Sequence, residues 1–387
     1  MPTPNSSDVV IIGGGVIGLT IARALRRSGV NDVWLIEKAE LGTEASFAAA
    51  GMLAPQVEAD SDDEFFRLAC RSRDMYVDFA AALLEETDVD VELDTTGTIY
   101  LAFTDSDEVH CEERYRWQTR SGFQVEKLTS REVRILEPCI NASVRSALLF
   151  PHDIQVENRR LVAALANSVK RAGVSILTHT RSHEIHVDGN RVIGVNTSSG
   201  FISCNTVVVS AGCWTGALRL TDRKGHSLGI TTLNIEPVRG QMVCLEARPQ
   251  VNRHVIYSPR GYIVPRRDGR LLAGSTSEPG VSVKQNTAGG LRSILDNALE
   301  ITPQLERLPL VDVWSGLRPK AADGLPVLGP CDEIDRLYYA TGHYRNGILL
   351  APITGELIVQ AILDPAKATA LASFSPNRFR TFSVGIS

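Results

Sequence analysis

A glycine-rich stretch near the N-terminus has the residue types and spacing needed to hold phosphate groups. Residues 13–18 read Gly-Gly-Gly-Val-Ile-Gly and directly follow the apolar, β-branched run 9–12. In such a pattern Gly13 permits a tight turn, Gly15 lets the backbone approach a pyrophosphate, and Gly18 lets a helix pack closely on the preceding strand. The phosphates then lie at a helix N-terminus, which favours negative charge. The stretch therefore predicts a dinucleotide site.

An acidic residue completes this unit. Glu37 ends the second predicted strand, residues 33–36, about twenty residues after Gly18. A carboxylate at this place accepts hydrogen bonds from ribose hydroxyls and repels a 2′-phosphate. Strand, glycines, helix, strand and acid occur in the required order, which favours dinucleotide binding over a purely structural βαβ unit.

A second glycine-framed helix start lies near the C-terminus. Residues 342–352 read Gly-His-Tyr-Arg-Asn-Gly-Ile-Leu-Leu-Ala-Pro and should open a helix that runs to about Leu363. We expect Pro352 in the first turn, where its missing N–H does no harm. The dipole of this helix would favour negative charge on whatever it faces. The alternative is a surface loop rich in glycine.

Small side chains crowd residues 42–53, Gly-Thr-Glu-Ala-Ser-Phe-Ala-Ala-Ala-Gly-Met-Leu. They would let the backbone approach a flat ligand closely. Taken alone, the segment equally fits the start of an ordinary alanine-rich helix.

Five stretches together resemble the glycine oxidase (ThiO-like) branch of the D-amino-acid oxidase family. They are the glycine fingerprint, Ala-Ala-Ala-Gly-Met at 48–52, Tyr-Ile-Val-Pro-Arg at 262–266 with Gly269 and Arg270, Gly-Leu-Arg-Pro at 316–319, and residues 342–352. The similarity covers nearly the whole chain in order. The first motif is shared by many dinucleotide enzymes, whereas the last is specific to this branch and its near relatives.

The resemblance implies an FAD-dependent oxidase of glycine and small primary or secondary amines such as sarcosine and D-alanine. The products would be the imine or 2-oxo acid and hydrogen peroxide from molecular oxygen, and in thiamine-making bacteria the imine feeds the thiazole ring. Sarcosine-type relatives attach FAD through a cysteine near the Gly-Leu-Arg-Pro motif. Residues 318–329 contain no cysteine and Cys331 lies beyond them, so we expect noncovalent FAD.

The resemblance also assigns site residues. Contacts to FAD fall on Gly13, Gly15, Val16, Ile17, Gly18, Glu37, Lys38, Ala48, Ala49, Gly51, Met52, Gly212, Trp214, His343, Arg345, Asn346, Gly347, Ile348 and Leu349. Arg318 takes the position of the carboxylate-binding arginine, Tyr262 that of the pocket tyrosine, and Arg345 that of a second polar contact to the substrate. The structural alternatives are a solvated loop charge for Arg318 and a strand packing residue for Tyr262.

Two positions depart from the family's pattern. Glycine oxidases tend to carry histidine two residues before the pocket tyrosine and methionine near the following Gly-x-Thr, where this chain has Arg260 and Ser277. If residues 258–264 form one strand, Arg260 and Tyr262 point to the same face, and the guanidinium could overhang the substrate pocket or its entrance. If the strand bends at Arg260, the side chain is solvated instead.

Composition limits the classes of protein that need consideration. The chain has 387 residues, 43% of them hydrophobic, and a net charge of −5 without long basic or acidic blocks. These values argue against nucleic acid or an anionic membrane as partners. Residues 1–7 form a short polar lead without signal-peptide features, and no apolar run approaches a membrane span, so we expect a cytoplasmic protein. Seven cysteines without Cys-x-x-Cys suit buried, reduced thiols better than disulfides or a metal site.

The expected fold class is α/β, with a Rossmann-like FAD-binding domain interleaved with an α+β substrate domain built on a mostly antiparallel sheet. The predicted FAD-binding domain comprises residues 1–88, 152–222 and 316–364, the substrate domain 89–151 and 223–315, and the C-terminal tail 365–387.

Hydrophobic periodicity predicts individual elements within these domains. It predicts a single long amphipathic helix over 62–86, further helices over 108–121, 158–172 and 290–307, a half-buried strand over 91–103, a hairpin of 191–196 with 201–204, and a separate buried strand over 206–212.

Other functions remain open from the sequence. A flavin dehydrogenase or sarcosine-type oxidase would share the fold but pass electrons to an acceptor other than oxygen. An NAD-dependent dehydrogenase or a non-catalytic flavin-binding protein would share the first βαβ unit. The second glycine-framed helix argues against NAD, because a nicotinamide enzyme has no use for a helix aimed at the far end of a flavin. The resemblance also implies a homo-oligomer, a tetramer.

Overall fold

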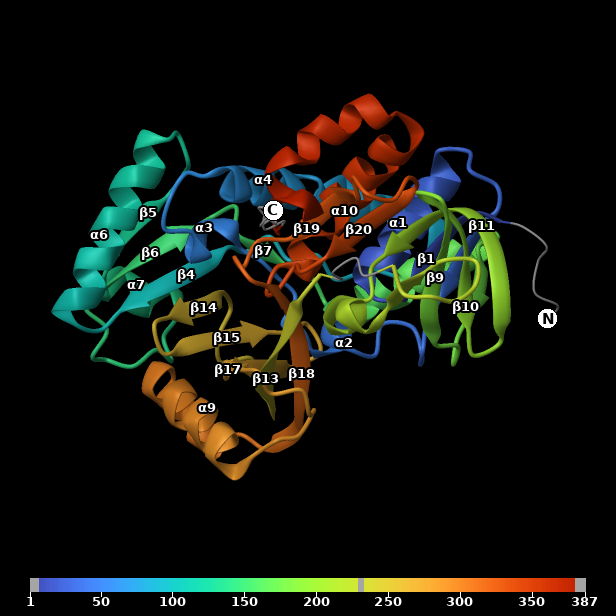
Figure 1. Cartoon of the computed structure of the whole chain (residues 1–387). Helices are drawn as coiled ribbons and strands as arrows, with labels where there is room; N and C mark the ends of the chain where they lie inside the picture. The colour runs from blue at the N-terminus through green and yellow to red at the C-terminus, as the bar shows by residue number, and fades with distance from the viewer. Residues whose placement is uncertain (1–6, 229–232, 380–387) are drawn as a thin grey trace, which may run out of the picture.

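The computed structural model describes residues 7–228 and 233–379. Two mixed β-sheets and a short β-ribbon form its framework, with helices packed around them (Figure 1). Residues 1–6 of the predicted lead and 380–387 of the predicted tail lie outside the described ranges.

The first sheet has a parallel centre, in which β20, β11, β1, β2 and β8 lie side by side in that order. An antiparallel extension through β10 and β9 leads to β12, and β19 pairs with β20 on the other side. Its strands are β1 (Ser7–Ile12), β2 (Val33–Ile36), β8 (Ser175–Leu177), β9 (Ser182–Asp188), β10 (Arg191–Thr197), β11 (Gly200–Val209), β12 (Arg219–Thr221), β19 (Val327–Pro330) and β20 (Leu337–Thr341).

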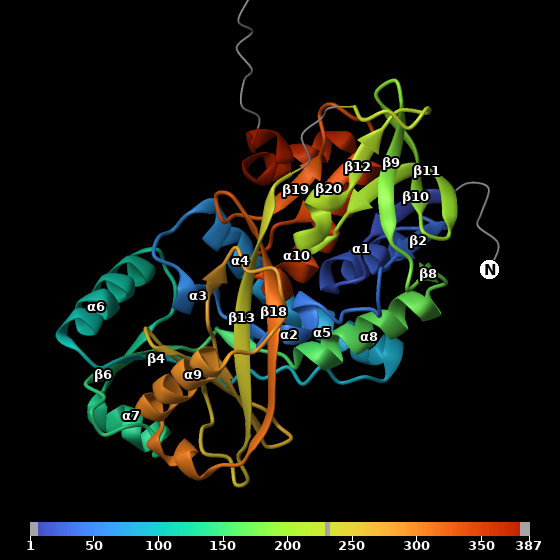
Figure 2. The ribbon, with the colours of Figure 1, turned by 60° about the horizontal axis from the view of Figure 1, so that its bottom comes forward.

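The second sheet is mostly antiparallel, with one parallel pair between β14 and β4. Its strands are β4 (Thr98–Ala102), β5 (Glu126–Thr129), β6 (Ser146–Phe150), β13 (Ile235–Glu246), β14 (Val255–Ser258), β15 (Gly261–Pro265), β16 (Arg270–Gly274), β17 (Glu278–Pro279) and β18 (Leu310–Ala321). The long strands β13 and β18 pair along their length and run side by side through the middle of Figure 2. The ribbon joins β3 (Met52–Leu53) to β7 (Ile154–Gln155).

Helices cover both sheets. They are α1 (Val16–Arg27), α2 (Ala45–Ala48), α3 (Pro55–Glu58), α4 (Glu64–Asp74), α5 (Tyr76–Thr87), α6 (Asp105–Arg120), α7 (Ser130–Leu136), α8 (Asn158–Arg171), α9 (Ala288–Ile301) and α10 (Gly347–Leu363), with short 3-10 helices η1 (Gly212–Ala217), η2 (Pro303–Arg307), η3 (Pro365–Phe374) and η4 (Pro376–Phe379). The largest apolar core lies where α1, α4, α5, α8 and α10 pack together over the parallel strands. A second core lies between the other sheet and α9.

The first βαβ unit and the helices around 108–121 and 158–172 are confirmed, but several predicted boundaries are wrong. The helix expected over 62–86 is interrupted at Met75, and the strand expected over 91–103 is only β4. Two left-handed residues, Glu92 (φ 54°) and Gly97 (φ 102°), and a turn in which Thr96 N–H donates to the Asp94 carboxylate break the extended backbone before β4.

Two further predicted boundaries are wrong, one because a strand pairs with two neighbours and the other because a proline ends a helix. The hairpin strand 201–204 and the strand 206–212 are one element, β11, because its first half pairs with β10 and its second half with β1. The helix expected over 290–307 ends at Ile301. Thr302 leaves the helical region and Pro303 starts the separate helix η2.

Pro352 lies in the second turn of α10 rather than the first. Proline has no N–H, so the carbonyl of Ile348 loses its helical partner. The buried hydroxyl of Tyr76 donates to that carbonyl, and Ser72 Oγ donates to the carbonyl of Leu349 at 2.6 Å. The interrupted segment α4–α5 thus supplies donors around the proline.

Within the described ranges, no helix has the length and apolarity to cross a membrane, and no cluster of three or more His, Cys, Asp or Glu side chains is arranged to hold a metal ion. None of the seven cysteines forms a disulfide among these residues, and three of them, Cys139, Cys213 and Cys331, are only partly buried.

Candidate functional site

One continuous cavity begins at the glycine loop after β1, passes the carboxyl ends of the parallel strands and ends between β13, β15 and β18 of the second sheet. Ligands of doubly wound sheets bind at the carboxyl ends of parallel strands. The cavity has one end at the predicted phosphate loop and the other at the predicted substrate residues.

The glycine loop has the geometry that its sequence predicts. Gly13 adopts φ 112°, and a Cβ on Gly18 would lie 1.9 Å from the Gly13 carbonyl oxygen, so a side chain at Gly18 would push α1 off the strand. Val16 N–H, in the first turn of α1, donates to Ser46 Oγ at 3.0 Å. The loop and the small-residue segment are thereby held together at the cavity wall.

Glu37 is buried at the end of β2 and lines the cavity. Its carboxylate accepts from Gly14 N–H at 2.8 Å and from Ala39 N–H at 3.0 Å. These bonds fix the carboxylate beside the glycine loop, where a ribose next to bound phosphates would lie.

Lys38 and Trp214, which are far apart in sequence, meet at the cavity. The Lys38 ammonium lies 3.0 Å from the centroid of the Trp214 ring and 3.2 Å from the Glu44 carboxylate. Gly212, Trp214, Ala48, Ala49, Gly51 and Met52 also line the cavity.

Arg318 lies on β18 with its guanidinium flat against Gly240 of the paired strand β13, so that a Cβ on Gly240 would lie 2.2 Å from Nη1. The guanidinium donates to Thr276 O at 3.1 Å and to Ser275 Oγ at 2.7 Å. No carboxylate in the described part of the chain forms an ion pair with it. Its positive charge is therefore open to an anionic ligand in the cavity.

Tyr262 lies on β15 and is 6% exposed, and its hydroxyl donates to Met242 Sδ at 3.2 Å. Its ring stacks on Tyr257 with 6.0 Å between the centroids. Tyr262, Met242 and Arg318 all line the same end of the cavity.

Arg345 also lines the cavity, but its charge is already engaged. Its Nη2 lies 3.1 Å from the Glu58 carboxylate and 3.2 Å from the Tyr257 hydroxyl. The negative charge of Glu58 raises the pKa of Arg345 above its ordinary value. Burial raises the pKa of Tyr257, which keeps that hydroxyl protonated.

His343 lies under the start of α10 and is buried. Burial lowers its pKa to about 3, so the ring is neutral, and Nε2 lies 3.1 Å from Thr354 Oγ1. His343, Asn346, Gly347 and Ile348 bring the second glycine-framed helix start to the cavity wall.

Two of the residues assigned to FAD contacts do not line the cavity. Gly18 instead permits close helix–strand packing, and Leu349 is buried with its carbonyl bound to Ser72. The other assigned cofactor residues, including Gly13, Gly15, Val16 and Ile17, do line it, as do all three assigned substrate residues.

Arg260 and Ser277 lie outside the cavity. Residues 258–264 are not one strand, because Pro259 and Arg260 form the turn between the paired strands β14 and β15. The Arg260 guanidinium lies 2.6 Å from the Glu300 carboxylate and over the Phe103 ring. Ser277 is exposed. Arg260 instead lines a separate, small pocket, to which Tyr262 and Ser275 also contribute, and it does not line the cofactor cavity.

Several lining residues were not identified from the sequence. Glu58 belongs to none of the sequence motifs, so nothing in the sequence pointed to it. Residues 180–183 follow β8, and the rule that ligands bind at the carboxyl ends of parallel strands could have identified them. Cys213 also lines the cavity, and burial raises the pKa of its thiol to about 12.

The cavity suits a dinucleotide joined to a flat ring. A Cβ on Gly13 or Gly14 would clash at its phosphate end. Ala48, Ala49 and Gly51 line it further along, and the other end has Tyr262 and Arg318, which no carboxylate of the described residues pairs.

Comparison with known proteins agrees with this geometry. Glycine oxidase of Geobacillus kaustophilus (strain HTA426) is 36% identical over 373 residues, 96% of this chain and 97% of that protein. The bifunctional protein ThiO/ThiG of Synechocystis sp. is 33% identical over 97% of this chain and 54% of that protein. The crystal structure of glycine oxidase from Geobacillus kaustophilus superimposes with a TM-score of 0.90 at 34% identity, over 98% of this chain and all of that one. The family model described as FAD dependent oxidoreductase matches residues 8–361. The chain therefore belongs to this family of FAD-dependent oxidoreductases, and FAD is its cofactor.

Proposed function

We propose that this protein oxidises glycine and other small primary or secondary amino acids, such as sarcosine and D-alanine, to the imine or 2-oxo acid with production of hydrogen peroxide. Relatives named glycine oxidase align with nearly the whole chain, which supports an amino acid substrate and oxygen as acceptor. The observation that carries the proposal is the Arg318 guanidinium, which lies on the wall of the cofactor cavity and forms no ion pair with any carboxylate of residues 7–228 and 233–379.

Arg318 would bind the substrate carboxylate. Two parallel N–H···O bonds to a carboxylate give both energy and orientation. The bonds to Ser275 and Thr276 and the backbone of Gly240 hold the guanidinium in one place, so the substrate needs little further ordering. A substrate fixed by its carboxylate presents its α-carbon toward the centre of the cavity.

Tyr262 would donate a further hydrogen bond to the same carboxylate in place of its bond to Met242. Arg345 is the proposed second polar contact. Because Glu58 balances its charge, Arg345 would act as a hydrogen-bond donor in the cavity wall rather than as a second carboxylate anchor.

FAD would be held by the glycine loop, Glu37, Lys38, residues 48–52, Gly212, Trp214 and the first turn of α10. When bound, it accepts the hydride equivalent from the substrate α-carbon. The chain's own residues need only bind, orient and exclude water, since no acid–base pair is required once the amine is neutral. The thiol of Cys213, with its raised pKa, is a poor nucleophile, which supports noncovalent FAD.

The domain division remains part of the proposal. We assign residues 1–88, 152–222 and 316–364 to FAD binding and 89–151 and 223–315 to substrate binding. A homotetramer, a cytoplasmic location and supply of the imine for the thiamine thiazole also belong here. The match to a ThiO/ThiG protein supports the last of these.

A peroxide assay with glycine, sarcosine and D-alanine tests the activity. We expect peroxide from at least one of them. Turnover with a dye acceptor but without peroxide in air would favour the dehydrogenase alternative. Yellow colour retained in acid-precipitated protein would contradict noncovalent FAD.

A further inference from the structure

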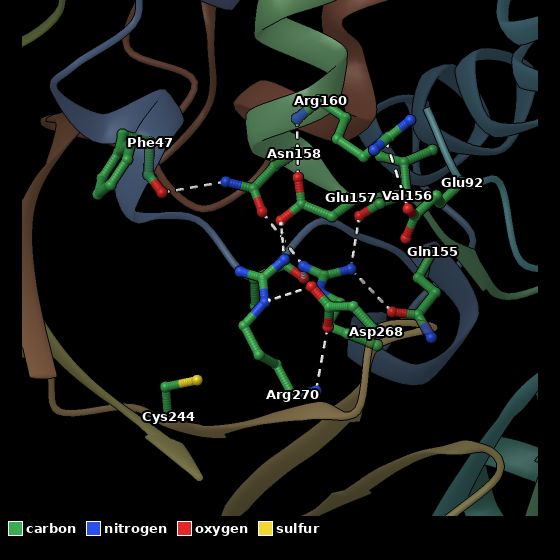
Figure 3. Close-up of polar contacts among 12 residues, drawn as sticks. Phe47, Glu92, Gln155, Val156, Glu157, Asn158, Arg160, Cys244, Asp268 and Arg270 are labelled. Atoms are coloured by element: carbon green, nitrogen blue, oxygen red, sulfur yellow. Dashed lines mark hydrogen bonds and ion pairs between the residues drawn. The ribbon is translucent and has the colours of Figure 1, made fainter. Parts of the chain in front are cut away.

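Arg266 follows β15 and is 3% exposed, so its positive charge lies inside the protein. Nη1 donates to Val156 O at 2.7 Å and to Gln155 Oε1 at 3.0 Å, and Nη2 donates to Ala50 O at 2.7 Å and to Asn158 Oδ1 at 3.1 Å. Figure 3 shows Gln155, Val156 and Asn158, which contribute three of these four acceptors, close to one another. All four acceptors are neutral amide oxygens, and the buried Nε has no hydrogen-bond partner in the part of the chain that the structure describes.

The carboxylates nearest to Arg266 are each in contact with another arginine. Glu157 lies 3.5 Å from Arg270, Asp268 lies 2.7 Å from Arg270, and Glu92 lies 3.4 Å from Arg160. Arg266 itself forms no ion pair within the described ranges. Burial lowers its pKa to about 10, so it remains charged at neutral pH.

The guanidinium lies directly behind the wall of the cofactor cavity. Ala50 and Gly51 line that cavity, and a Cβ on Gly51 would lie 3.1 Å from Nη2. The acceptor Asn158 continues the contact, since its Nδ2 donates to Ser46 O at 2.9 Å and to Phe47 O at 3.1 Å. Ser46 in turn accepts from Val16 at the phosphate loop.

We propose that Arg266 is a positioning and electrostatic residue for FAD. It holds residues 46–51 in place and supplies a fixed positive charge in the cavity wall, which would favour the negatively charged reduced flavin once FAD is bound. An apolar side chain here would leave four buried acceptors without a donor, whereas a neutral donor such as an amide could serve some of them without the desolvation penalty of a buried charge. A charge in a low-dielectric wall acts on a neighbouring charge more strongly than it would in water. The inference rests on FAD binding and not on which amine is oxidised.

The test uses the FAD-loaded full chain and compares Arg266→Lys with Arg266→Gln. Lysine keeps the charge and loses part of the geometry, whereas glutamine loses the charge. Arg267→Gln is the matched control, because Arg267 is the next residue, is half exposed and pairs with Asp90 at 3.1 Å. The readouts are the dissociation constant of sulfite, an anion that adds to oxidised flavin, and the midpoint potential of FAD.

We expect Arg266→Gln to bind sulfite at least tenfold more weakly than the parent, and Arg266→Lys and Arg267→Gln to stay within about threefold. An accompanying tenfold shift in the two-electron reduction equilibrium corresponds to a potential lower by about 30 mV. Equal losses in the lysine and glutamine variants, or no loss in either, would overturn the electrostatic role.

If Arg266→Gln does not retain FAD, a second pair of variants tests whether the positive charge of Arg266 acts on the flavin. Gln155→Glu places a carboxylate beside Nη1 and compensates the charge, whereas Gln155→Met removes the same amide without adding charge. Sulfite binding at least tenfold weaker in the glutamate variant than in the methionine variant supports the proposal, and equal binding overturns it. Because sulfite binding requires no amine, a failure here is distinct from an absence of glycine turnover.

Discussion

The Arg318 guanidinium lies against the backbone of Gly240 and lines the cavity. No carboxylate of the described residues forms an ion pair with it. Arg318→Ala removes one partner of the charge pair with the substrate carboxylate, a loss of about 2–5 kcal/mol. This corresponds to a decrease in kcat/KM of roughly thirty- to several-thousand-fold. FAD content should stay normal, which an absorbance ratio checks. A loss of less than about threefold would show that another group anchors the carboxylate.

Gly240→Ala is the matched second variant for this prediction. The added methyl group would lie within 2.4 Å of three guanidinium atoms and must displace Arg318 without removing its charge. We expect a raised KM for glycine with Arg318 still present. An unchanged KM would mean that the contact between Gly240 and the guanidinium does not position Arg318.

Arg260 illustrates a limit of inference from sequence. Its place two residues before Tyr262 predicts a shared face only if the strand is continuous, and the hairpin turn at Pro259 and Arg260 removes that condition. The partner, Glu300, lies forty residues away on α9. Local sequence contains no signal of that contact.

Arg260→His should therefore leave substrate choice unchanged. We expect the ratio of kcat/KM for D-aspartate to that for D-alanine to stay within about twofold of the parent. Since the ion pair with Glu300 is near the surface, its loss should lower the free energy of unfolding by about 0–1 kcal/mol. A fivefold change in the ratio would place the guanidinium in the pocket and contradict the structure.

At the scale of elements, the two glycine-framed helix starts were predictable because each is encoded locally. The position of Pro352 in α10 was not, because the donors that make it tolerable, Tyr76 and Ser72, come from α4 and α5 far away in sequence. A proline in a second turn is unfavourable by local rules and is stabilised here by tertiary contacts.

Tyr76→Phe tests that arrangement. It leaves the Ile348 carbonyl buried without a donor, which should lower the free energy of unfolding by about 1–3 kcal/mol. Ile348 lines the cavity, so the dissociation constant of FAD should also rise several-fold. Urea unfolding of the apoprotein and titration with FAD measure the two effects.

Tyr338→Phe is the control for the same helix. Tyr338 donates to Ala361 O at 3.3 Å, near the opposite end of α10. Its loss should lower stability without changing FAD affinity. If both variants weakened FAD equally, the effect would be one of general stability and not of the helix start.

At the scale of the whole molecule, the sequence predicted one parallel and one mostly antiparallel sheet. The glycine fingerprint and the apolar runs specify the parallel centre of the first. The sequence could not predict the pairing of β13 with β18 within the second sheet, because that pairing joins residues 65 to 86 positions apart. The same pairing places Arg318 against Gly240. The substrate end of the site is thus a product of long-range pairing, and only the resemblance to known oxidases identified its residues.

Glu86 links three helices of the largest core, and its behaviour at acid pH tests how they hold together. Glu86 lies on α5, and its carboxylate accepts hydrogen bonds from Arg23 of α1 at 2.6 Å and from Ser168 of α8 at 2.6 Å. Burial alone would raise its pKa, but these bonds outweigh burial and lower it from 4.5 to about 2. A lowered pKa contributes stability that is fully present above the unfolded value and is lost as the pH falls toward 2.

Glu86→Gln should therefore destabilise the protein in a pH-dependent manner. The carboxylate is partly exposed, so we expect a difference of about 1–2 kcal/mol from the parent at pH 7 rather than the full value of the pKa displacement. The difference should be constant down to about pH 5 and shrink as the pH falls toward 3, because the carboxylate of the unfolded parent then binds a proton while that of the folded parent stays ionised until about pH 2. Urea unfolding at a fixed excess of FAD measures it, with Glu85→Gln, an exposed neighbour, as control. A difference that does not change with pH would mean that Glu86 stabilises the helices by packing rather than by its charge.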